Sequence, residues 1–230
     1  MSEPSVPASR PEDLLLPALP QTMRLALAYA PAPARLPTLS LLALDQRLAG
    51  LLRHSREPMM AQIRLAWWRE TLDRDAAKWP EGEPLLAALR SWNGAHRALV
   101  PLVNGWEALT GEAPLAPEAL EEMVNGRAAA FAGLAAALGR DGEAEAARGL
   151  GRRWALADLA TKLNHPGESV VVRRLAQAEQ GRSPRVSRAL RPLAVLEALA
   201  RDALAENGPG NGRGSARKVF MAMRIGLLGR

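Results

Sequence analysis

Apolar residues recur along this chain at the three- and four-residue spacing of α-helices. Within residues 38–53, for example, Leu41, Leu44 and Leu48 fall on one face of a helix. No segment alternates apolar and polar residues over a sustained length, and the β-branched run at residues 170–172 is too short to argue for a sheet. The sequence therefore predicts an all-α fold.

Prolines and glycines divide the chain into a series of expected helices. They are expected at about residues 21–29, 38–53, 58–75, 84–92, 95–110, 117–138, 142–163, 168–180, 186–206 and 216–228. The stretch from Pro31 to Pro37 is expected to break the chain between the first two helices. Pro58 suits the first turn of the third.

The composition of the two ends predicts how the chain is organised. Residues 1–20 contain five prolines, so we expect a mostly disordered arm with a short turn at residues 14–16. One helical domain follows over residues 21–206, then a flexible linker at residues 207–215. Residues 216–230 are expected to form a basic amphipathic helix. Its apolar stripe favours docking on the core, and contact with an anionic lipid surface is left open.

The composition also argues against several classes of protein. The chain has no cysteine, which excludes disulfides, thiolate metal sites and thiol nucleophiles. The net charge of +6 comes almost entirely from arginine, and no zinc-finger or RNA-stacking motif accompanies it, so we expect no nucleic-acid partner. No secretory signal and no run of about 18 apolar residues is present. We therefore expect a cytoplasmic protein, and we leave peripheral contact with a membrane open.

Residues 36–73 carry the pattern that is most informative about function. Arg35 lies seven residues before Leu42, and residues 42–46 read LALDQ. Residues 65–69, which read LAWWR, contain a Leu-x-x-Trp-Arg pattern. These features resemble the first two core helices of the squalene/phytoene synthases. The resemblance implies an isoprenoid-synthase-type helical bundle over the greater part of the chain.

The acidic residues that hold magnesium in that family are missing here. Pairs of acids at positions i and i+4 project from one helix face and suit Mg²⁺ binding. In the register that the resemblance implies, the first pair falls on Ala49 and Arg53. The segment that resembles the second motif, residues 149–163, has Asp158 as its only acid, and Lys162 stands four residues later.

Two functions remain open at this point. The first is a catalytically degenerate relative, similar to the branch that contains a complex I assembly factor, which binds an isoprenoid or lipid in an apolar cavity or binds a protein partner. It would need no cofactor. The alternative is an active head-to-head prenyl-diphosphate transferase, which would use Mg²⁺ and in which arginines replace part of the lost metal charge. We favour the non-catalytic function.

The candidate site residues follow from the same segment. Arginine pairs with diphosphate through two parallel hydrogen bonds, so arginines near the resembling helices are candidates for anion binding. These are Arg35, Arg47, Arg53, Arg64 and Arg69. The candidates for lining an apolar cavity are Leu42, Trp67, Trp68 and Phe131. No catalytic residue is assigned, and Glu70 and Asp73 are the weak candidates for a metal site.

Overall fold

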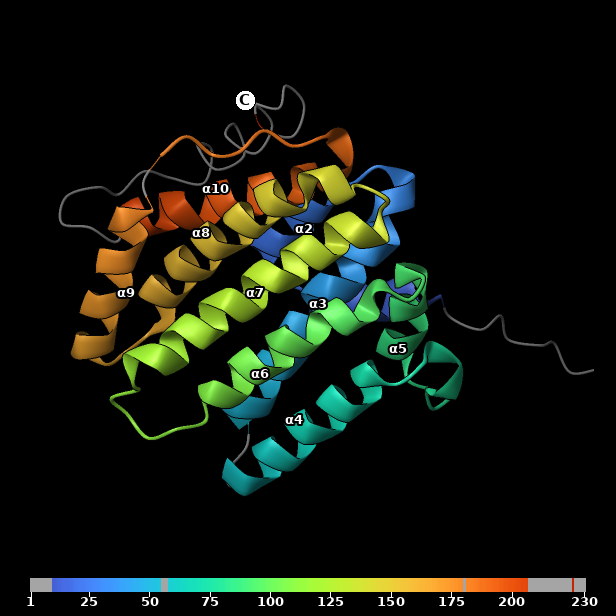
Figure 1. Ribbon diagram of the computed structural model, residues 1–230, viewed down its shortest axis with the longest axis horizontal. Coiled ribbons are helices and arrows are strands. Elements are labelled where there is room, and N and C mark those ends of the chain that lie inside the picture. The colour runs from blue at the N-terminus through green and yellow to red at the C-terminus, as the bar shows by residue number, and fades with distance from the viewer. Residues whose placement is uncertain (1–9, 55–57, 180, 207–224, 226–230) are drawn as a thin grey trace, which may run out of the picture.

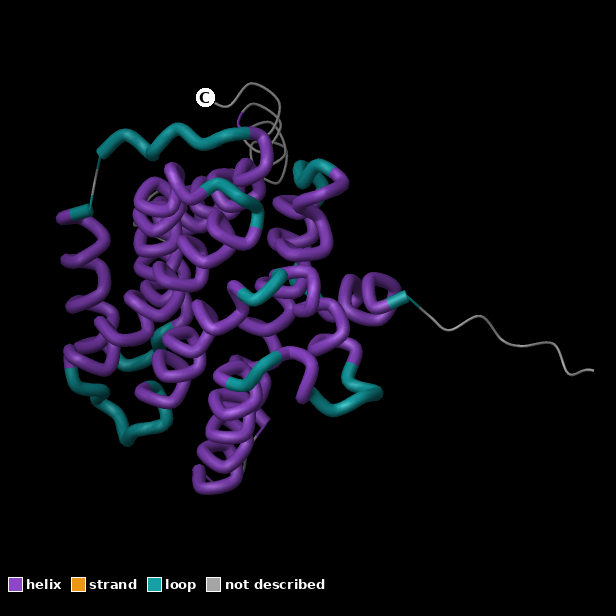
Figure 2. The backbone as a smooth tube through the Cα atoms, turned by 45° about the vertical axis from the view of Figure 1, so that its right-hand side comes forward, coloured by secondary structure: helices purple, strands orange, loops and turns teal. Residues whose placement is uncertain are grey.

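Helices are the only regular secondary structure in the described part of the chain, as the sequence predicts (Figure 1). The computed structural model describes residues 10–54, 58–179, 181–206 and 225. The long helices are α3 (Ala32–His54), α4 (Pro58–Asp73), α7 (Pro117–Ala137), α8 (Ala144–Lys162) and α10 (Arg191–Glu206). Within these residues no strand occurs, so helices and loops alone make up the described backbone (Figure 2).

Shorter elements connect the long helices. The short α-helices are α1 (Pro11–Leu15), α2 (Gln21–Leu27), α5 (Pro84–Leu89), α6 (Val100–Ala108) and α9 (Pro166–Ala178). The described residues also contain six 3₁₀ turns: η1 (Leu16–Ala18), η2 (Ala76–Lys78), η3 (Arg90–Trp92), η4 (Ala95–Leu99), η5 (Asp141–Glu143) and η6 (Arg188–Leu190).

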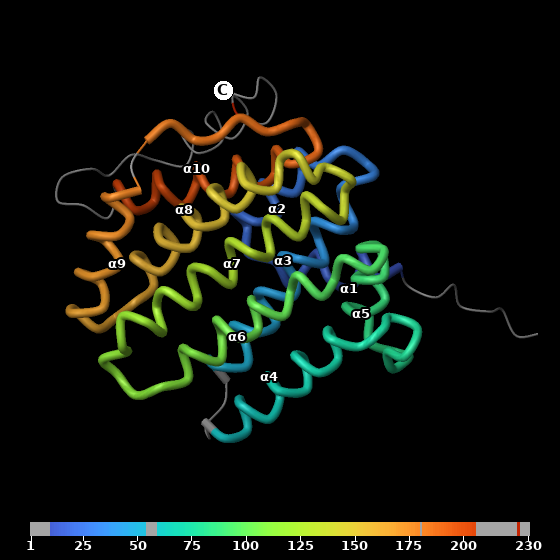
Figure 3. Tube along the Cα trace, viewed as in Figure 1, coloured from blue at the N-terminus to red at the C-terminus, as the bar shows by residue number. Residues whose placement is uncertain are grey.

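Helix α7 lies near the middle of the bundle. It packs against α6 on one side and α8 on the other, and α8 in turn contacts α9 and α10 (Figure 3). Helix α3 lies behind these helices, whereas α4 lies at an edge of the molecule, next to α6 (Figure 1). Helix α7, which is rich in alanine and glycine, therefore lies between α3, α6 and α8.

The small residues of α7 and α8 allow their backbones to approach closely. A Cβ atom built on Gly151 would lie 2.9 Å from the Cα of Ala128 and 2.9 Å from the Cγ of Phe131. A Cβ atom on Gly126 would collide with the carbonyl oxygen of Pro101. Glycine at these two positions is therefore what lets α7 contact α6 and α8 directly.

Helix α3 begins earlier than the sequence predicts. The expected break from Pro31 to Pro37 is wrong for most of its length, because α3 starts at Ala32. The amide of Ala34 donates to the carbonyl of Pro31 at 2.9 Å, which starts the first turn. Pro33 lies within that turn, where a missing N–H costs nothing. Pro37 lies inside the helix, and its carbonyl accepts hydrogen bonds from the hydroxyl of Ser40 and the indole of Trp92.

The N-terminal segment also differs from the expectation. Residues 10–20, which we expected within a mostly disordered arm, form α1 and η1, and they bury Leu15 and Leu19 in the core. Leucines lie between the prolines of this stretch, and Leu15 and Leu19 provide apolar contacts that the proline content alone does not indicate. Residues 1–9 and the expected linker at 207–215 lie outside the described residues, as does the expected helix at 216–230 apart from Ile225, which packs partly buried against the core.

None of the helices in the described ranges is both long enough and apolar enough to cross a membrane.

Candidate functional site

A buried arginine joins three helices at the centre of the bundle. Arg127 on α7 reaches Asp45 on α3 through two hydrogen bonds, from Nε to Oδ1 at 3.0 Å and from Nη2 to Oδ2 at 3.1 Å. Its Nη1 donates to Oδ2 of Asp158 on α8 at 2.7 Å. The side chains of Arg127 and Asp45 are only 1% and 2% exposed. We call Asp45, Arg127 and Asp158 the charge centre.

Two tryptophans cover the charge centre. The guanidinium carbon of Arg127 lies 4.2 Å from the ring centroid of Trp154 and 5.3 Å from that of Trp106, both within the range of cation–π attraction. The indole N–H of Trp106 also donates to Oδ1 of Asp45 at 3.0 Å. The ring of Phe131 stacks on that of Trp154, with ring centroids 5.1 Å apart. Water is therefore excluded from most of the guanidinium.

The charges of the centre stabilise one another. Burial on its own would lower the pKa of Arg127, but the attraction of Asp45 and Asp158 raises that pKa above its ordinary value. For Asp158, burial would raise the pKa, whereas Arg127 and Lys162 lower it. The Nζ atom of Lys162 lies 2.8 Å from Oδ1 of Asp158. The two carboxylates are thus balanced by two cations of the protein itself.

The space beside the charge centre is closed. It is lined by residues of α3, α6, α7 and α8, among them Leu42 and Phe131, and it has no room for a water molecule. These two candidate cavity residues are therefore core residues that pack beside Arg127. A long apolar ligand could enter here only if the helices separated, because packed interiors do not accommodate added atoms without movement.

The two candidate tryptophans lie in different environments, because adjacent residues of a helix point in directions about 100° apart. Trp68 is 4% exposed and belongs to the core, whereas Trp67 is 43% exposed. Their rings meet edge to face, with centroids 5.0 Å apart. Neither tryptophan lines the closed space next to the charge centre.

Two of the five candidate arginines lie in surface ion pairs. Arg47 on α3 pairs with Glu83 at 3.4 Å, and Arg69 on α4 pairs with Glu107 on α6. Both pairs are partly exposed, so each neutralises its arginine without burying it. An anion would have to compete with these carboxylates.

The other three candidate arginines do not converge on one site. The Nη1 atom of Arg35 is 3.5 Å from the carbonyl of Leu27, while Arg53 and Arg64 are exposed. Arg35 and Arg53 are 18 positions apart on α3, which corresponds to about 27 Å along a helix. The five arginines therefore do not form a single rim, and a role of any one of them in anion binding stays a prediction.

The weak metal candidates lie on the surface of α4. Glu70 pairs with Arg74 at 3.3 Å, and both side chains are more than half exposed. Asp73 is exposed, and its backbone carbonyl accepts a hydrogen bond from Arg97. Within the residues that the structure describes, no group of three or more histidine, aspartate or glutamate side chains is arranged to hold a metal ion.

Helix α4 also presents an apolar stripe to the outside. Met59, Ile63 and Trp67 follow one another at four-residue spacing and are 68%, 56% and 43% exposed. Met60 lies beside them and is 41% exposed. Large apolar side chains that adjoin one another on a surface are a feature of contact sites. The sequence prediction included only Trp67 of this set.

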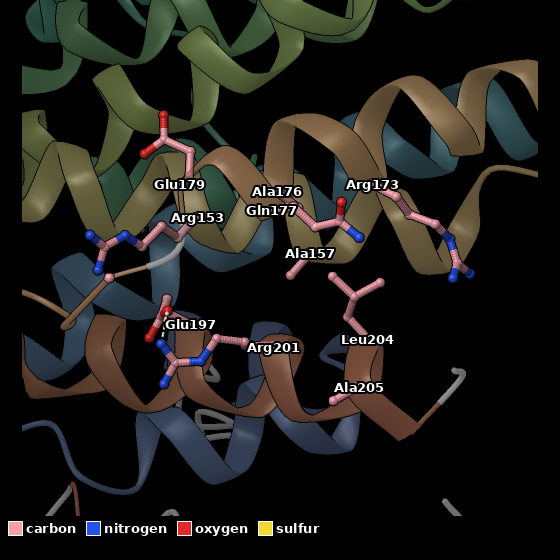
Figure 4. Close-up of a pocket in the computed structure, with 11 residues that line it drawn as sticks. Arg153, Ala157, Arg173, Ala176, Gln177, Glu179, Glu197, Arg201, Leu204 and Ala205 are labelled. Atoms are coloured by element: carbon pink, nitrogen blue, oxygen red, sulfur yellow. Dashed lines mark ion pairs between the residues drawn. The ribbon is translucent and has the colours of Figure 1, made fainter. Parts of the chain in front are cut away.

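A cavity of about 620 Å³ lies between α8, α9 and α10 (Figure 4). It was not predicted, because its walls come from three segments that no motif connects. Its lining includes the apolar residues Ala157, Ala176 and Leu204 and the arginines Arg153, Arg173 and Arg201. None of the residues that line this cavity belongs to the charge centre.

The arginine of the charge centre was also missed by the sequence reasoning, although a signal for it exists. Arg127 is the single charged residue between Glu122 and Arg140, in a segment rich in alanine and glycine. Asp45 is likewise the only acid of residues 32–54, and Asp158 is the only acid of residues 149–163. Isolated charges of opposite sign on apolar helix faces predict a buried pair, because an unpaired one would be too costly to bury.

Comparison with known proteins does not identify the chain, since no family model, no curated protein and no solved structure matches it.

Proposed function

We propose that this chain is a catalytically inert relative of the squalene/phytoene synthases that acts as a binding or assembly factor. The observation that carries the proposal is the position of Arg127. Asp45 lies on the helix that resembles the one carrying the first metal motif, and Asp158 lies on the helix that resembles the second. Arg127 bridges the two carboxylates.

The proposal follows from what ionisation of an allylic diphosphate requires. The departing diphosphate needs Mg²⁺ and neighbouring cations to neutralise its charge. In this protein both carboxylates that face each other across the bundle already accept hydrogen bonds from an internal cation. A magnesium ion would have to displace a buried guanidinium, at the cost of leaving that charge unpaired.

A binding role is supported by two surfaces away from the charge centre. The apolar stripe on α4 offers contact area for a protein partner, and the cavity between α8, α9 and α10 offers room for a small ligand. Neither surface needs a metal ion. We propose the cytoplasm as the location, with peripheral membrane contact left open.

The decisive experiment follows diphosphate release from farnesyl and geranylgeranyl diphosphate, with and without Mg²⁺. We expect no release by the purified protein above that of a protein-free control, while a cooperative thermal transition shows that the protein is folded. Magnesium-dependent release by the same preparation would overturn the proposal and establish the alternative, an active prenyl-diphosphate transferase.

A further inference from the structure

We propose that the cavity between α8, α9 and α10 binds an amphipathic anion, whose carboxylate or phosphate group pairs with Arg173 and whose apolar chain lies along Ala157, Ala176 and Leu204. This inference rests on the proposed binding function and names its ligand class. Its test measures ligand affinity and no turnover, so it can fail while the protein remains catalytically inert.

The shape and lining of the cavity suit such a molecule. Its volume of about 620 Å³ lies within the range of small-molecule sites, which is roughly 300–1,000 Å³. In Figure 4 the apolar side chains of Ala157 and Leu204 face each other across the middle of the cavity. The guanidinium groups of Arg153 and Arg173 lie on opposite sides of this apolar middle.

The acidic residues of the lining are already engaged. Glu179 accepts a hydrogen bond at 2.6 Å from Arg152, an arginine that does not line the cavity. Glu197 is 1% exposed, pairs with Arg201 at 3.2 Å and accepts a hydrogen bond from the hydroxyl of Ser183 at 2.9 Å. These two carboxylates therefore do not neutralise the remaining arginines of the cavity.

The two remaining arginines of the lining, Arg153 and Arg173, have N–H groups that donate no hydrogen bond within the described part of the chain. Across the described residues, Arg173 makes no ion pair and no hydrogen bond, although it lines the cavity. Arg153 donates a hydrogen bond from Nη1 to the carbonyl of Arg182 at 3.1 Å. Its buried Nε has no hydrogen-bond partner among the residues that the structure describes. Because a guanidinium forms strong paired hydrogen bonds with carboxylate and phosphate oxygens, an anion at Arg173 would satisfy its free donors.

The unpaired guanidinium of Arg173 and the apolar wall of the cavity together determine which kind of molecule fits. Inorganic phosphate would satisfy Arg173 but leave the apolar wall in contact with water. An uncharged alcohol would cover the wall but leave the guanidinium without a counter-charge. Only a molecule with an anionic group and an apolar chain uses both parts of the cavity.

The experiment is a calorimetric titration of the full-length protein with decanoate, decyl phosphate, decanol and inorganic phosphate, each amphiphile kept below its micelle concentration. We expect binding of decanoate or decyl phosphate, and whichever binds more tightly assigns the headgroup. Arg173→Gln should weaken that binding about tenfold or more, because one charge-assisted contact is lost. Arg174→Gln, at the exposed neighbouring position, is the matched control and should leave affinity unchanged.

A second variant tests the apolar wall. Ala176→Phe fills the cavity from the partly buried side of α9, so it should abolish binding while the thermal transition stays within a few degrees of that of the unchanged protein. The proposal is overturned if the folded protein binds neither amphiphile, if inorganic phosphate binds as tightly as decyl phosphate, or if Arg173→Gln binds both amphiphiles with unchanged affinity.

Discussion

The guanidinium carbon of Arg127 lies 4.2 Å from the ring centroid of Trp154 on the neighbouring helix. The same arginine pairs with Asp45 and Asp158, so one side chain links α3, α7 and α8 by charge and by contact with an aromatic face. Because the guanidinium of Arg127 is almost completely buried, we assign this side chain a structural role.

Removing the central cation should destabilise the protein strongly. Arg127→Met leaves the carboxylate of Asp45 buried without its counter-charge, which we expect to lower the free energy of unfolding by about 3–5 kcal/mol. Urea denaturation followed by tryptophan fluorescence measures this change. Arg148→Met, which breaks an exposed pair with Glu145, is the control and should cost less than about 1 kcal/mol.

A double variant that combines Asp45→Asn with Arg127→Met tests why the loss of Arg127 destabilises the protein. If the cost comes from an unpaired buried charge, the double variant should be more stable than Arg127→Met alone, because the amide still accepts the hydrogen bond from Trp106. A double variant that is less stable than Arg127→Met would contradict this explanation.

The stability contributed by Asp158 should depend on pH. Arg127 and Lys162 hold the native pKa of Asp158 below the ordinary 3.8, so its folded state binds a proton less readily than its unfolded state. The contribution is therefore fully present above about pH 4 and is lost as the pH falls through the native pKa. Urea titrations at several pH values should show Asp158→Asn less stable than the unchanged protein by about 2 kcal/mol at pH 6, with the difference shrinking below pH 4. Asp141→Asn, at an exposed position, should show no such difference.

Restoring the first acidic pair should not restore magnesium binding. Ala49 is 4% exposed within the core and Arg53 is exposed, so Ala49→Asp with Arg53→Asp would bury one unpaired carboxylate. We expect a loss of stability of about 1–3 kcal/mol and no heat of Mg²⁺ binding in calorimetry. Arg53→Asp alone should be close to neutral in stability. Stoichiometric Mg²⁺ binding by the double variant would show that the old metal geometry survives and would weaken the case for an inert protein.

The two adjacent tryptophans of α4 should behave oppositely. Trp68→Ala removes a buried side chain and should cost about 3–5 kcal/mol in unfolding free energy. Trp67→Ala, at the exposed stripe, should cost less than about 1 kcal/mol. Denaturation of both single variants under the same conditions compares them, and equal losses would mean that the stripe is packed against something in solution.

Helix positions could be predicted from this sequence because apolar spacing and breakers are local signals. The segment expected at residues 117–138 is α7, Pro117–Ala137, and that expected at 142–163 is η5 followed by α8, Ala144–Lys162. The early start of α3 was missed because Pro33 is compatible with the first turn of a helix and Pro37 is tolerated inside it, which the breaker rule ignores.

The candidate site was much harder to predict, since it depends on contacts between distant residues. Asp45 and Arg127 are 82 positions apart, and only the folded bundle brings them together. Lys162 stands four residues after Asp158, and the structure shows that the two side chains form an ion pair, which the sequence reasoning did not predict. The cavity between α8, α9 and α10 had no local signature, because ordinary alanines and surface-type arginines line it.

The contacts at Gly126 and Gly151 have a consequence for how the lineage of this chain can diverge. Any side chain at these two positions would push α7 away from a neighbouring helix. Relatives of this chain that keep the same helix packing should therefore have glycine at both positions. Together with an isolated acid–arginine–acid set on the three long helices, this pair of glycines offers a signature for recognising them.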